Sequence, residues 1–217
     1  MSGHALFSAR LLEFNLLPSR TLHPSRNARY GTPDRAIPLR LAPAWHRHCS
    51  REILRRLNLT DRPVRDTTRP ELILALMPPD RMARLARHVG AIFCASRLRR
   101  AIRGNEVREL TAGLGADVLD FARRAAPAVP TASDAADGGI DALEAAALPA
   151  GIDRLGYAAL AGAFRCGGAE LALRAELKLP DLPVQPAPCE DAACLDVALA
   201  VLKLIDSSWH SSFPAMR

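Results

Sequence analysis

One stretch of the sequence, between Pro78 and Phe93, restricts the fold more than any other. Two prolines and an aspartate open it, and apolar residues then return every three or four positions. That spacing places them on one face of an α-helix, and proline is favoured in the first turn because no amide donor is needed there. The stretch therefore predicts an amphipathic helix. Its apolar stripe is Met82, Leu85, Ala86, Val89, Ile92 and Phe93, and the opposite face carries Arg81, Arg84, Arg87 and His88.

Similar helical spacing recurs along the chain, and the composition agrees with it. Apolar residues make up 49% of the chain, and alanine and leucine, which both favour helices, supply most of them. Runs of valine and isoleucine, which are typical of buried strands, are nearly absent. The sequence predicts a mainly α fold, namely a single irregular helical domain with a proline-rich N-terminal arm.

Prolines and small polar residues divide the chain of 217 residues into parts. Five prolines lie between residues 15 and 43, and proline both removes an amide donor and restricts the residue before it. We expect an extended arm there, following a short helix at 4–14. The expected parts are an N-terminal helix and arm at 1–43, a helical core at 44–126, a linker at 127–139, and a C-terminal helical part at 140–217 that packs on the core.

Further helices are expected wherever apolar spacing resumes between prolines and glycines. Gly104 is expected to stop a short helix at 98–104, Asn105 to cap the next helix, and Pro149 to end a helix at 140–148. The remaining predicted helices span residues 44–57, 70–77, 116–126, 151–164, 169–177 and 190–205, and a loose tail is expected at 207–217.

Positive charge is concentrated in the first half of the sequence. Residues 1–103 contain 20 arginines and 7 acidic residues, whereas residues 104–217 contain 9 basic and 16 acidic residues. Such asymmetry is typical of chains that bind nucleic acid or a membrane surface. It is also expected where the two halves complement each other or face different protein partners. Because the arginines are scattered rather than bunched, we favour the second interpretation.

Sequence signatures of catalysis are missing. Neither the phosphate-binding pattern G-x-x-x-x-G-K nor the hydrolase pattern G-x-S-x-G occurs. The glycines at 113 and 115 lack the third glycine that a dinucleotide-binding turn requires, and they interrupt a helical pattern. We therefore expect a protein that is not an enzyme, with no catalytic residue and no cofactor.

Histidines and cysteines are too dispersed to predict a metal site. On a helix, His46 and His48 point about 200° apart, and His46 with Cys49 alone would make a weak site. The five cysteines have no regular spacing and no signal peptide is evident, which predicts free thiols in a reducing cytosol. No uncharged apolar run reaches the length of about 18 residues that a membrane-spanning helix needs.

Two clusters of arginines leave another class of function open. Such patches can contact phosphate groups. Interleaved aromatic residues, a helix-turn-helix pattern and a lysine-rich tail are missing, however. A basic helical nucleic-acid-binding regulatory protein is therefore the alternative to a protein-binding adaptor. The clusters are Arg51, Arg55 and Arg56, and Arg97, Arg99, Arg100 and Arg103.

The segment from Glu13 to Arg26, EFNLLPSRTLHPSR, carries a family resemblance. Its F-N-x-x-P pattern, followed by a hydrophobic residue and His-Pro-Ser, resembles the SctK (YscK/PscK) family of type III secretion proteins. Three later stretches, at 81–90, 96–104 and 114–123, are similar to the core helices of that family in the same order. The resemblance covers roughly residues 10–125, and beyond residue 126 only the helical character agrees.

The resemblance implies a non-enzymatic adaptor in the cytosolic sorting platform of a bacterial injectisome. Members of the family bridge the cytoplasmic domain of the inner-membrane ring protein SctD and the pod protein SctQ. The pods connect onward to the stator SctL and the ATPase SctN. The resemblance further implies a place in the bacterial cytoplasm at the base of the injectisome, with no cofactor, no nucleic acid and no insertion into the membrane.

Candidate partner-binding residues follow from this role. Interface cores favour aromatic anchors, and charges at the rim mainly set the encounter rate and the choice of partner. For Phe14 and Trp45 the alternative is ordinary core packing, and for His23-Pro24-Ser25 it is a turn that caps the next segment. The candidates are Phe14, Leu22, His23, Pro24, Trp45, Arg97, Arg99 and Arg100.

Overall fold

A computed structural model of the protein describes residues 3–31, 41–125, 129, 144–183 and 185–213. Within these residues the chain forms twelve α-helices and two short 3-10 helices, and it contains no strand. The prediction of a mainly α fold is confirmed.

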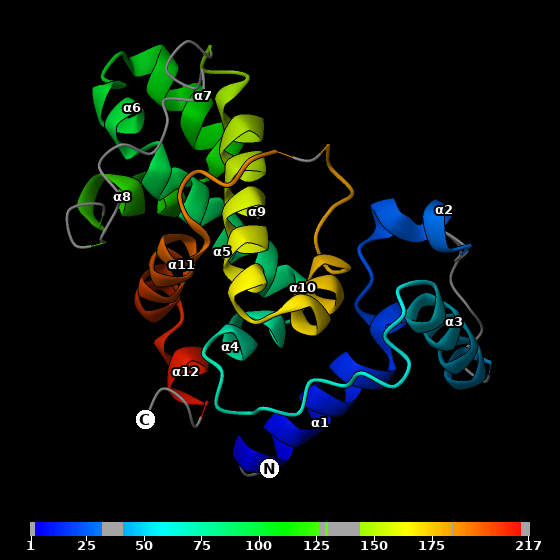
Figure 1. Cartoon of the computed structure of the whole chain (residues 1–217). Helices are drawn as coiled ribbons and strands as arrows, with labels where there is room; N and C mark the ends of the chain where they lie inside the picture. The colour runs from blue at the N-terminus through cyan, green and yellow to red at the C-terminus, as the bar shows by residue number, and fades with distance from the viewer. Residues whose placement is uncertain (1–2, 32–40, 126–128, 130–143, 184, 214–217) are drawn as a thin grey trace.

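Figure 1 shows the order of the helices, in which long connections precede α4 and α11. The first elements are α1 (Gly3–Leu16), the 3-10 helices η1 (Pro18–Arg20) and η2 (Pro24–Arg26), α2 (Asn27–Tyr30) and α3 (Ala42–Arg56). The middle elements are α4 (Glu71–Ala75), α5 (Pro79–Phe93), α6 (Ala95–Arg100), α7 (Gly104–Leu114) and α8 (Ala116–Ala125). The last elements are α9 (Leu148–Cys166), α10 (Ala169–Glu176), α11 (Asp191–Ile205) and α12 (Ser207–Ser211).

Helices α5 and α9 pack against each other at the centre of the molecule, and two glycines permit their close approach (Figure 1). A Cβ atom at Gly90 would overlap the carbonyl oxygen of Ile152, and one at Gly156 would overlap the carbonyl oxygen of Ala86. Glycine inside a helix costs about 1 kcal/mol relative to alanine. Direct backbone contact between the two helices, rather than helix propensity, therefore explains both glycines.

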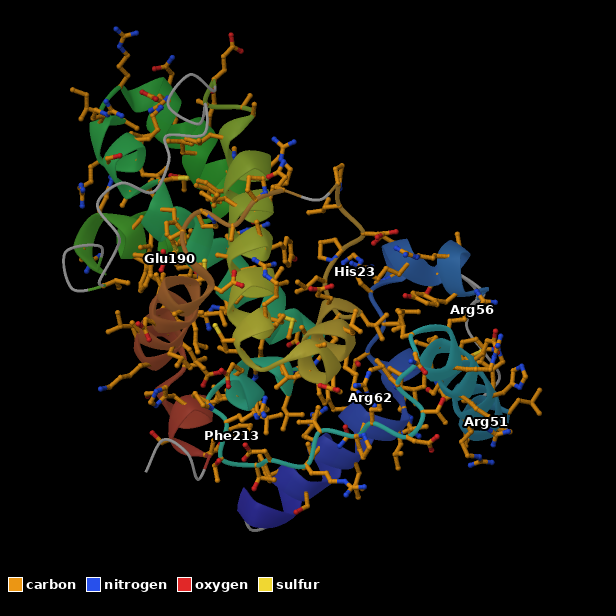
Figure 2. All side chains as sticks on the ribbon, in the orientation of Figure 1. His23, Arg51, Arg56, Arg62, Glu190 and Phe213 are labelled. Carbon is orange, nitrogen blue, oxygen red and sulfur yellow. The ribbon has the colours of Figure 1, made fainter. Side chains whose placement is uncertain are left out.

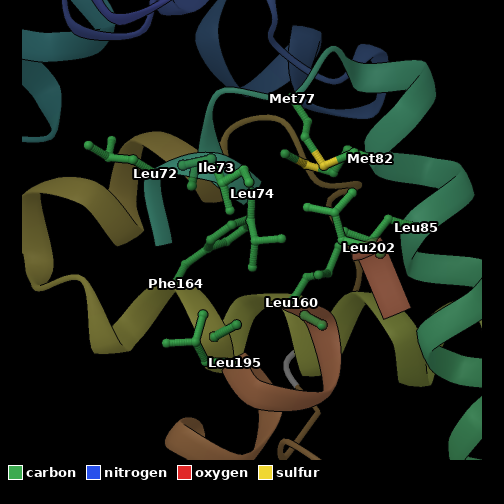
Figure 3. Packing of buried hydrophobic residues seen from close by; sticks show 14 of the residues in the cluster. Leu72, Ile73, Leu74, Met77, Met82, Leu85, Leu160, Phe164, Leu195 and Leu202 are labelled. Atoms are coloured by element: carbon green, nitrogen blue, oxygen red, sulfur yellow. The ribbon is translucent and has the colours of Figure 1, made fainter. Parts of the chain in front are cut away.

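The main hydrophobic core lies between α4, α5, α9, α10 and α11. Figure 3 shows Phe164 of α9 at its centre, with Leu74 of α4 and Leu202 of α11 close by, and all three side chains are fully buried. A fully buried phenylalanine typically contributes a few kcal/mol to stability. The stripe predicted on α5 faces this core, except that Phe93 is only partly buried.

The expected loose tail is wrong for the described residues up to 213. Asp206 caps α12, because its carboxylate accepts a hydrogen bond from the amide of Trp209 at 3.0 Å. The Trp209 indole donates to the carbonyl oxygen of Ile73 at 2.9 Å, and Phe213 packs edge-on against Phe7 with ring centroids 5.3 Å apart. The end of the chain thus closes the core beside α1.

A second core joins α6, α7 and α8 to the first half of α9, and two predicted boundaries are wrong there. Gly104 begins α7 instead of ending the helix before it, and the N-cap position belongs to Arg103, not to Asn105. Pro149 lies in the first turn of α9 and does not end a helix. Both errors have one cause, because glycine and proline mark a boundary without showing on which side the helix lies.

His88 is an exception to the polar face predicted for α5. It is 2% exposed, its Nδ1 lies 2.8 Å from the Arg84 carbonyl oxygen, and its ring stands edge-on to Phe121 of α8 at 5.0 Å. Burial lowers the pKa of this imidazole, which favours the neutral form. The reason for the discrepancy is that α8 covers a position at the border of the two faces.

The proline-rich arm is more regular than predicted over residues 15–31. Pro18 and Pro24 open the two 3-10 helices, where their missing amide hydrogens cost nothing, and Gly31 ends α2 at a φ of 65°. Residues 32–40 of the arm lie outside the described part. The predicted linker at 127–139 also lies outside it, except Val129, which is buried in the main core.

Ion pairs connect the basic first half of the chain to the acidic second half. Most involve partly exposed side chains, and such pairs contribute about 1 kcal/mol or less each. Their number nevertheless means that much of the arginine charge is compensated within the molecule, as the complementary-halves interpretation requires. They join Arg26 and Arg29 to Asp181, Arg62 to Glu170, Arg81 to Asp206, Arg87 to Asp153 and Arg97 to Glu106.

Candidate functional site

The segment that carries the family resemblance begins with a buried amide. Asn15 donates from Nδ2 to the Val64 carbonyl oxygen at 3.0 Å and accepts the Val64 amide at Oδ1 at 2.9 Å. Both residues are 8% exposed. The connector between α3 and α4 is thereby held against the end of α1, and its backbone groups are satisfied where water has little access.

Replacing this asparagine by an apolar residue is expected to destabilise the fold. In Asn15→Leu both backbone groups of Val64 lose their partner while they stay buried, and the free energy of unfolding should fall by about 2 kcal/mol. Urea denaturation measures this loss. Asn105→Ala, at an exposed position in the first turn of α7, is the control and should change stability by less than about 0.5 kcal/mol. Equal denaturation midpoints would contradict the assigned role of Asn15.

Ser19 joins η1 to α3. Its hydroxyl lies 2.8 Å from the Ser50 hydroxyl and 3.0 Å from Nδ1 of His46, and its amide donates to the Ser50 hydroxyl at 3.2 Å. Burial lowers the pKa of His46, with a smaller contribution from Arg20, so this imidazole is mainly neutral at pH 7. The histidine that the sequence offered as half of a weak metal site serves here as a hydrogen-bonding group.

His23, Pro24 and Ser25 form the turn that was the alternative to a partner contact. The His23 imidazole accepts the Ser25 amide at 3.2 Å and so caps η2, while the His23 amide donates to the Leu177 carbonyl oxygen at 2.9 Å. Arg26 then donates to the Leu179 carbonyl oxygen at 2.8 Å. The segment therefore attaches to the chain after α10, as Figure 2 shows for His23.

Phe14 and Leu22 also contact the rest of the chain. Phe14 is 5% exposed and belongs to the main core. This is the core packing that the sequence allowed as the alternative to partner binding. Leu22 packs partly buried against a small cluster that contains Tyr30 and Ile53. Of the candidates in the segment 13–26, only Pro24 is well exposed.

The remaining candidates occupy two separate places. Trp45 is partly buried on α3, edge-on to His46. Arg97 is largely covered and pairs with Glu106 at 2.7 Å, so it stabilises the contact of α6 with α7. Arg99 and Arg100 are exposed beside the link that carries Ile102, which is 84% exposed. The structure thus does not bring the eight candidates together into one site.

An open, mainly apolar groove lies between α1 and α3. Its volume is about 820 Å³. Leu54 of α3 forms part of the floor, whereas Leu12 and Leu16 of α1 line it with 60% and 58% of their surface exposed. Exposed apolar side chains that lie next to one another and are surrounded by polar residues are typical of interaction surfaces.

Charged residues surround this groove. Glu13 pairs with Arg10 at 3.4 Å and with Arg20 at 3.6 Å on the α1 side. On the α3 side, Arg47 and Arg51 are exposed, and neither forms an ion pair with another described residue. Figure 2 shows Arg51 at the outer surface of α3. The groove therefore combines an apolar floor with an excess of positive charge.

The sequence prediction missed the leucines of this groove. A signal was available, because α1 carries leucines on more than one side, at positions 11, 12 and 16, and a helix packed on one face cannot bury all of them. Arg51 did belong to a predicted cluster, but its neighbours Arg55 and Arg56 pair with Glu52 instead of facing the groove.

The placement of the histidine, cysteine and acidic side chains bears on metal binding and on thiol chemistry. No three histidine, cysteine or acidic side chains among them lie close enough together to hold an ion. The Sγ atoms of Cys189 and Cys194 lie 3.2 Å apart at the start of α11, and both side chains contact the main core. Burial, followed by the hydrogen bond to Cys189, raises the pKa of Cys194 to about 12, so this thiol is a poor nucleophile at neutral pH.

None of the helices in the described part of the chain combines the length and the apolar character that a bilayer crossing requires. Comparisons with models of protein families, with curated proteins and with solved structures found no match to this chain.

Proposed function

We propose that this protein is a non-enzymatic adaptor that binds other proteins, and that it serves the cytosolic sorting platform of a type III secretion injectisome. The observation that carries the first part is the arginine-rimmed apolar groove between α1 and α3. Contact of such a surface with another protein is favourable in free energy, because the exposed leucines are removed from water on binding. The resemblance of residues 10–125 to the SctK family supports the second part.

The geometry suggests how such an adaptor presents its binding surface. Asn15, Ser19 and His23 attach the N-terminal segment to three different parts of the chain. The groove wall formed by α1 is therefore held in place before a partner arrives. Preorganisation of this kind lowers the entropy that binding must overcome. In the proposed role the partners are a SctQ-type pod protein and the cytoplasmic domain of a SctD-type ring protein.

Co-expression with these two partners tests the proposal. We expect the full chain to copurify with at least one of them at physiological salt and to show little affinity for non-specific duplex DNA under the same conditions. A nucleic-acid-binding protein would behave in the opposite way. Its binding releases counterions from the DNA, and because this release becomes less favourable as the salt concentration rises, its affinity would fall steeply with salt. Failure to retain either partner, together with salt-sensitive DNA binding, would overturn the adaptor proposal.

A further inference from the structure

We infer that the groove between α1 and α3 binds one short amphipathic helix of a partner protein, with acidic residues along the flank that faces α3. The inference deepens the proposed function, on which the identity of the partner rests. The chemistry of the groove does not depend on that identity, because it follows from the residues that line it.

Both walls of the groove are helices, which restricts the conformation of its occupant. Away from the helix ends, the backbone donors and acceptors of α1 and α3 are used within each helix, so an extended peptide would find no strand edge to pair with. A helix satisfies its own backbone and needs only side-chain contacts, and laying an apolar face into a groove is its common mode of binding.

The dimensions of the groove suit a helix of two to three turns. Its lining runs from Ala9 to Leu16 on α1 and from Pro43 to Leu54 on α3. At a rise of 1.5 Å per residue these stretches are about 10 Å and about 16 Å long, and one helical turn takes about 5.4 Å. Leu12 and Leu16 are one turn apart, so they can contact apolar residues at positions i, i+3 or i+4, and i+7 of the occupant.

The charged residues around the groove favour an occupant that carries negative charge. On the α1 side Glu13 compensates part of the charge of Arg10 and Arg20. On the α3 side Arg47 and Arg51 are four residues apart, on the same face of the helix, and have no acidic partner in the described chain. Two carboxylates one turn apart on the occupant would meet both guanidinium groups, whereas two lysines would be repelled.

Fluorescence anisotropy with the full chain tests this inference directly. The probe is a labelled, alanine-based helical peptide of about 14 residues, with leucines at i, i+3 and i+7 and glutamates four residues apart beside them. The matched probe has lysine in place of each glutamate. We expect the acidic peptide to bind about tenfold more tightly than the basic one. In Arg47→Glu/Arg51→Glu this preference should reverse.

Variants and controls separate the groove from a general charge effect. Leu12→Ser/Leu16→Ser should weaken the binding of both peptides, and because both leucines are exposed the melting temperature should change little. Arg99→Glu/Arg108→Glu makes the same charge change at exposed positions away from the groove and should keep the wild-type preference. Equal affinity of wild type for the two peptides, or no reversal in the arginine variant, would overturn the inference.

Two further outcomes distinguish this inference from the proposed function. If a SctQ-type or SctD-type partner copurifies equally well with wild type and with Arg47→Glu/Arg51→Glu, the adaptor function stands and the groove is not its docking site. If the acidic peptide binds but neither partner does, the groove inference stands and the proposed partners are wrong. A concentration-dependent dimer that the leucine variant abolishes would show that a second copy of the chain occupies the groove, and this too would overturn the inference.

Discussion

A Gly156→Ala variant is expected to unfold at a temperature about 6 °C below that of the wild type. The new methyl group would overlap the Ala86 carbonyl oxygen, which belongs to the backbone of α5 and cannot turn aside as a side chain would. The two central helices must therefore separate, and overpacking of this kind costs about 3 kcal/mol or more, against a gain of about 1 kcal/mol in helix propensity. Circular dichroism during a thermal scan measures the change.

Gly104→Ala is the matched control for this prediction. Gly104 is also in a helix, but it is exposed, and a Cβ atom there would meet no atom within 4 Å. The control should therefore keep or slightly raise the stability, by at most about 1 kcal/mol. If Gly156→Ala behaved like Gly104→Ala, α5 and α9 would not be in the backbone contact described above.

The stability of the protein is expected to rise by about 1.5 kcal/mol between pH 7 and pH 8.5 because of one buried lysine. Lys178 is 5% exposed, and its ammonium group donates to the carbonyl oxygens of Ala75 at 2.6 Å and Met77 at 2.5 Å, at the end of α4. Burial, with a smaller contribution from Arg10, lowers its pKa from the ordinary value of 10.5 to about 7.

The direction of the effect follows from the protons that each state binds. Between pH 7 and pH 10.5 the unfolded chain keeps the Lys178 proton while the folded protein releases it, so raising the pH favours the folded state. Below pH 7 the full cost of burying the charged amine is present. Above about pH 9 the buried thiols act in the opposite direction, because burial raises the pKa of Cys49 and of Cys194.

Urea denaturation at pH 7.0 and pH 8.5 tests this expectation, with Lys178→Met beside the wild type. The variant has no group that titrates at this position, so the rise of about 1.5 kcal/mol should disappear from it. Lys203→Met makes the same substitution at an exposed position of α11 and should keep the wild-type rise. Parallel results for the wild type and Lys178→Met would show that the lysine does not release its proton in this window.

The helices with the strongest apolar spacing were predicted well. The predicted stretches at 44–57 and 190–205 differ from α3 and α11 by two residues at most at either end, and the Pro78-Pro79 start of α5 is correct. In these cases the sequence signals that define the helix are local, because an apolar stripe and the prolines beside it belong to one helix. Predictions failed where a boundary residue serves the following helix instead of the preceding one, as Gly104 and Pro149 do.

The candidate site could be predicted only in part. His23-Pro24-Ser25 forms the turn that the sequence allowed, and Phe14 is in the core as its alternative stated. The groove was not predicted, because its exposed leucines look like core residues in the sequence. Which leucines of α1 stay exposed depends on where α3 stops covering them, and that is a property of packing between elements far apart in the chain.

The sequence by itself determined that this protein is helical, where most of its helices lie, and that opposite charges are separated along the chain. These properties depend on residue types and spacings within a few turns. The tertiary structure alone decided that Lys178 and His88 are buried, that arginines of the first half pair with acids of the second, and that Leu12 and Leu16 remain exposed beside Arg47 and Arg51. Burial, pairing and exposure depend on which distant helices meet, and no local pattern encodes that.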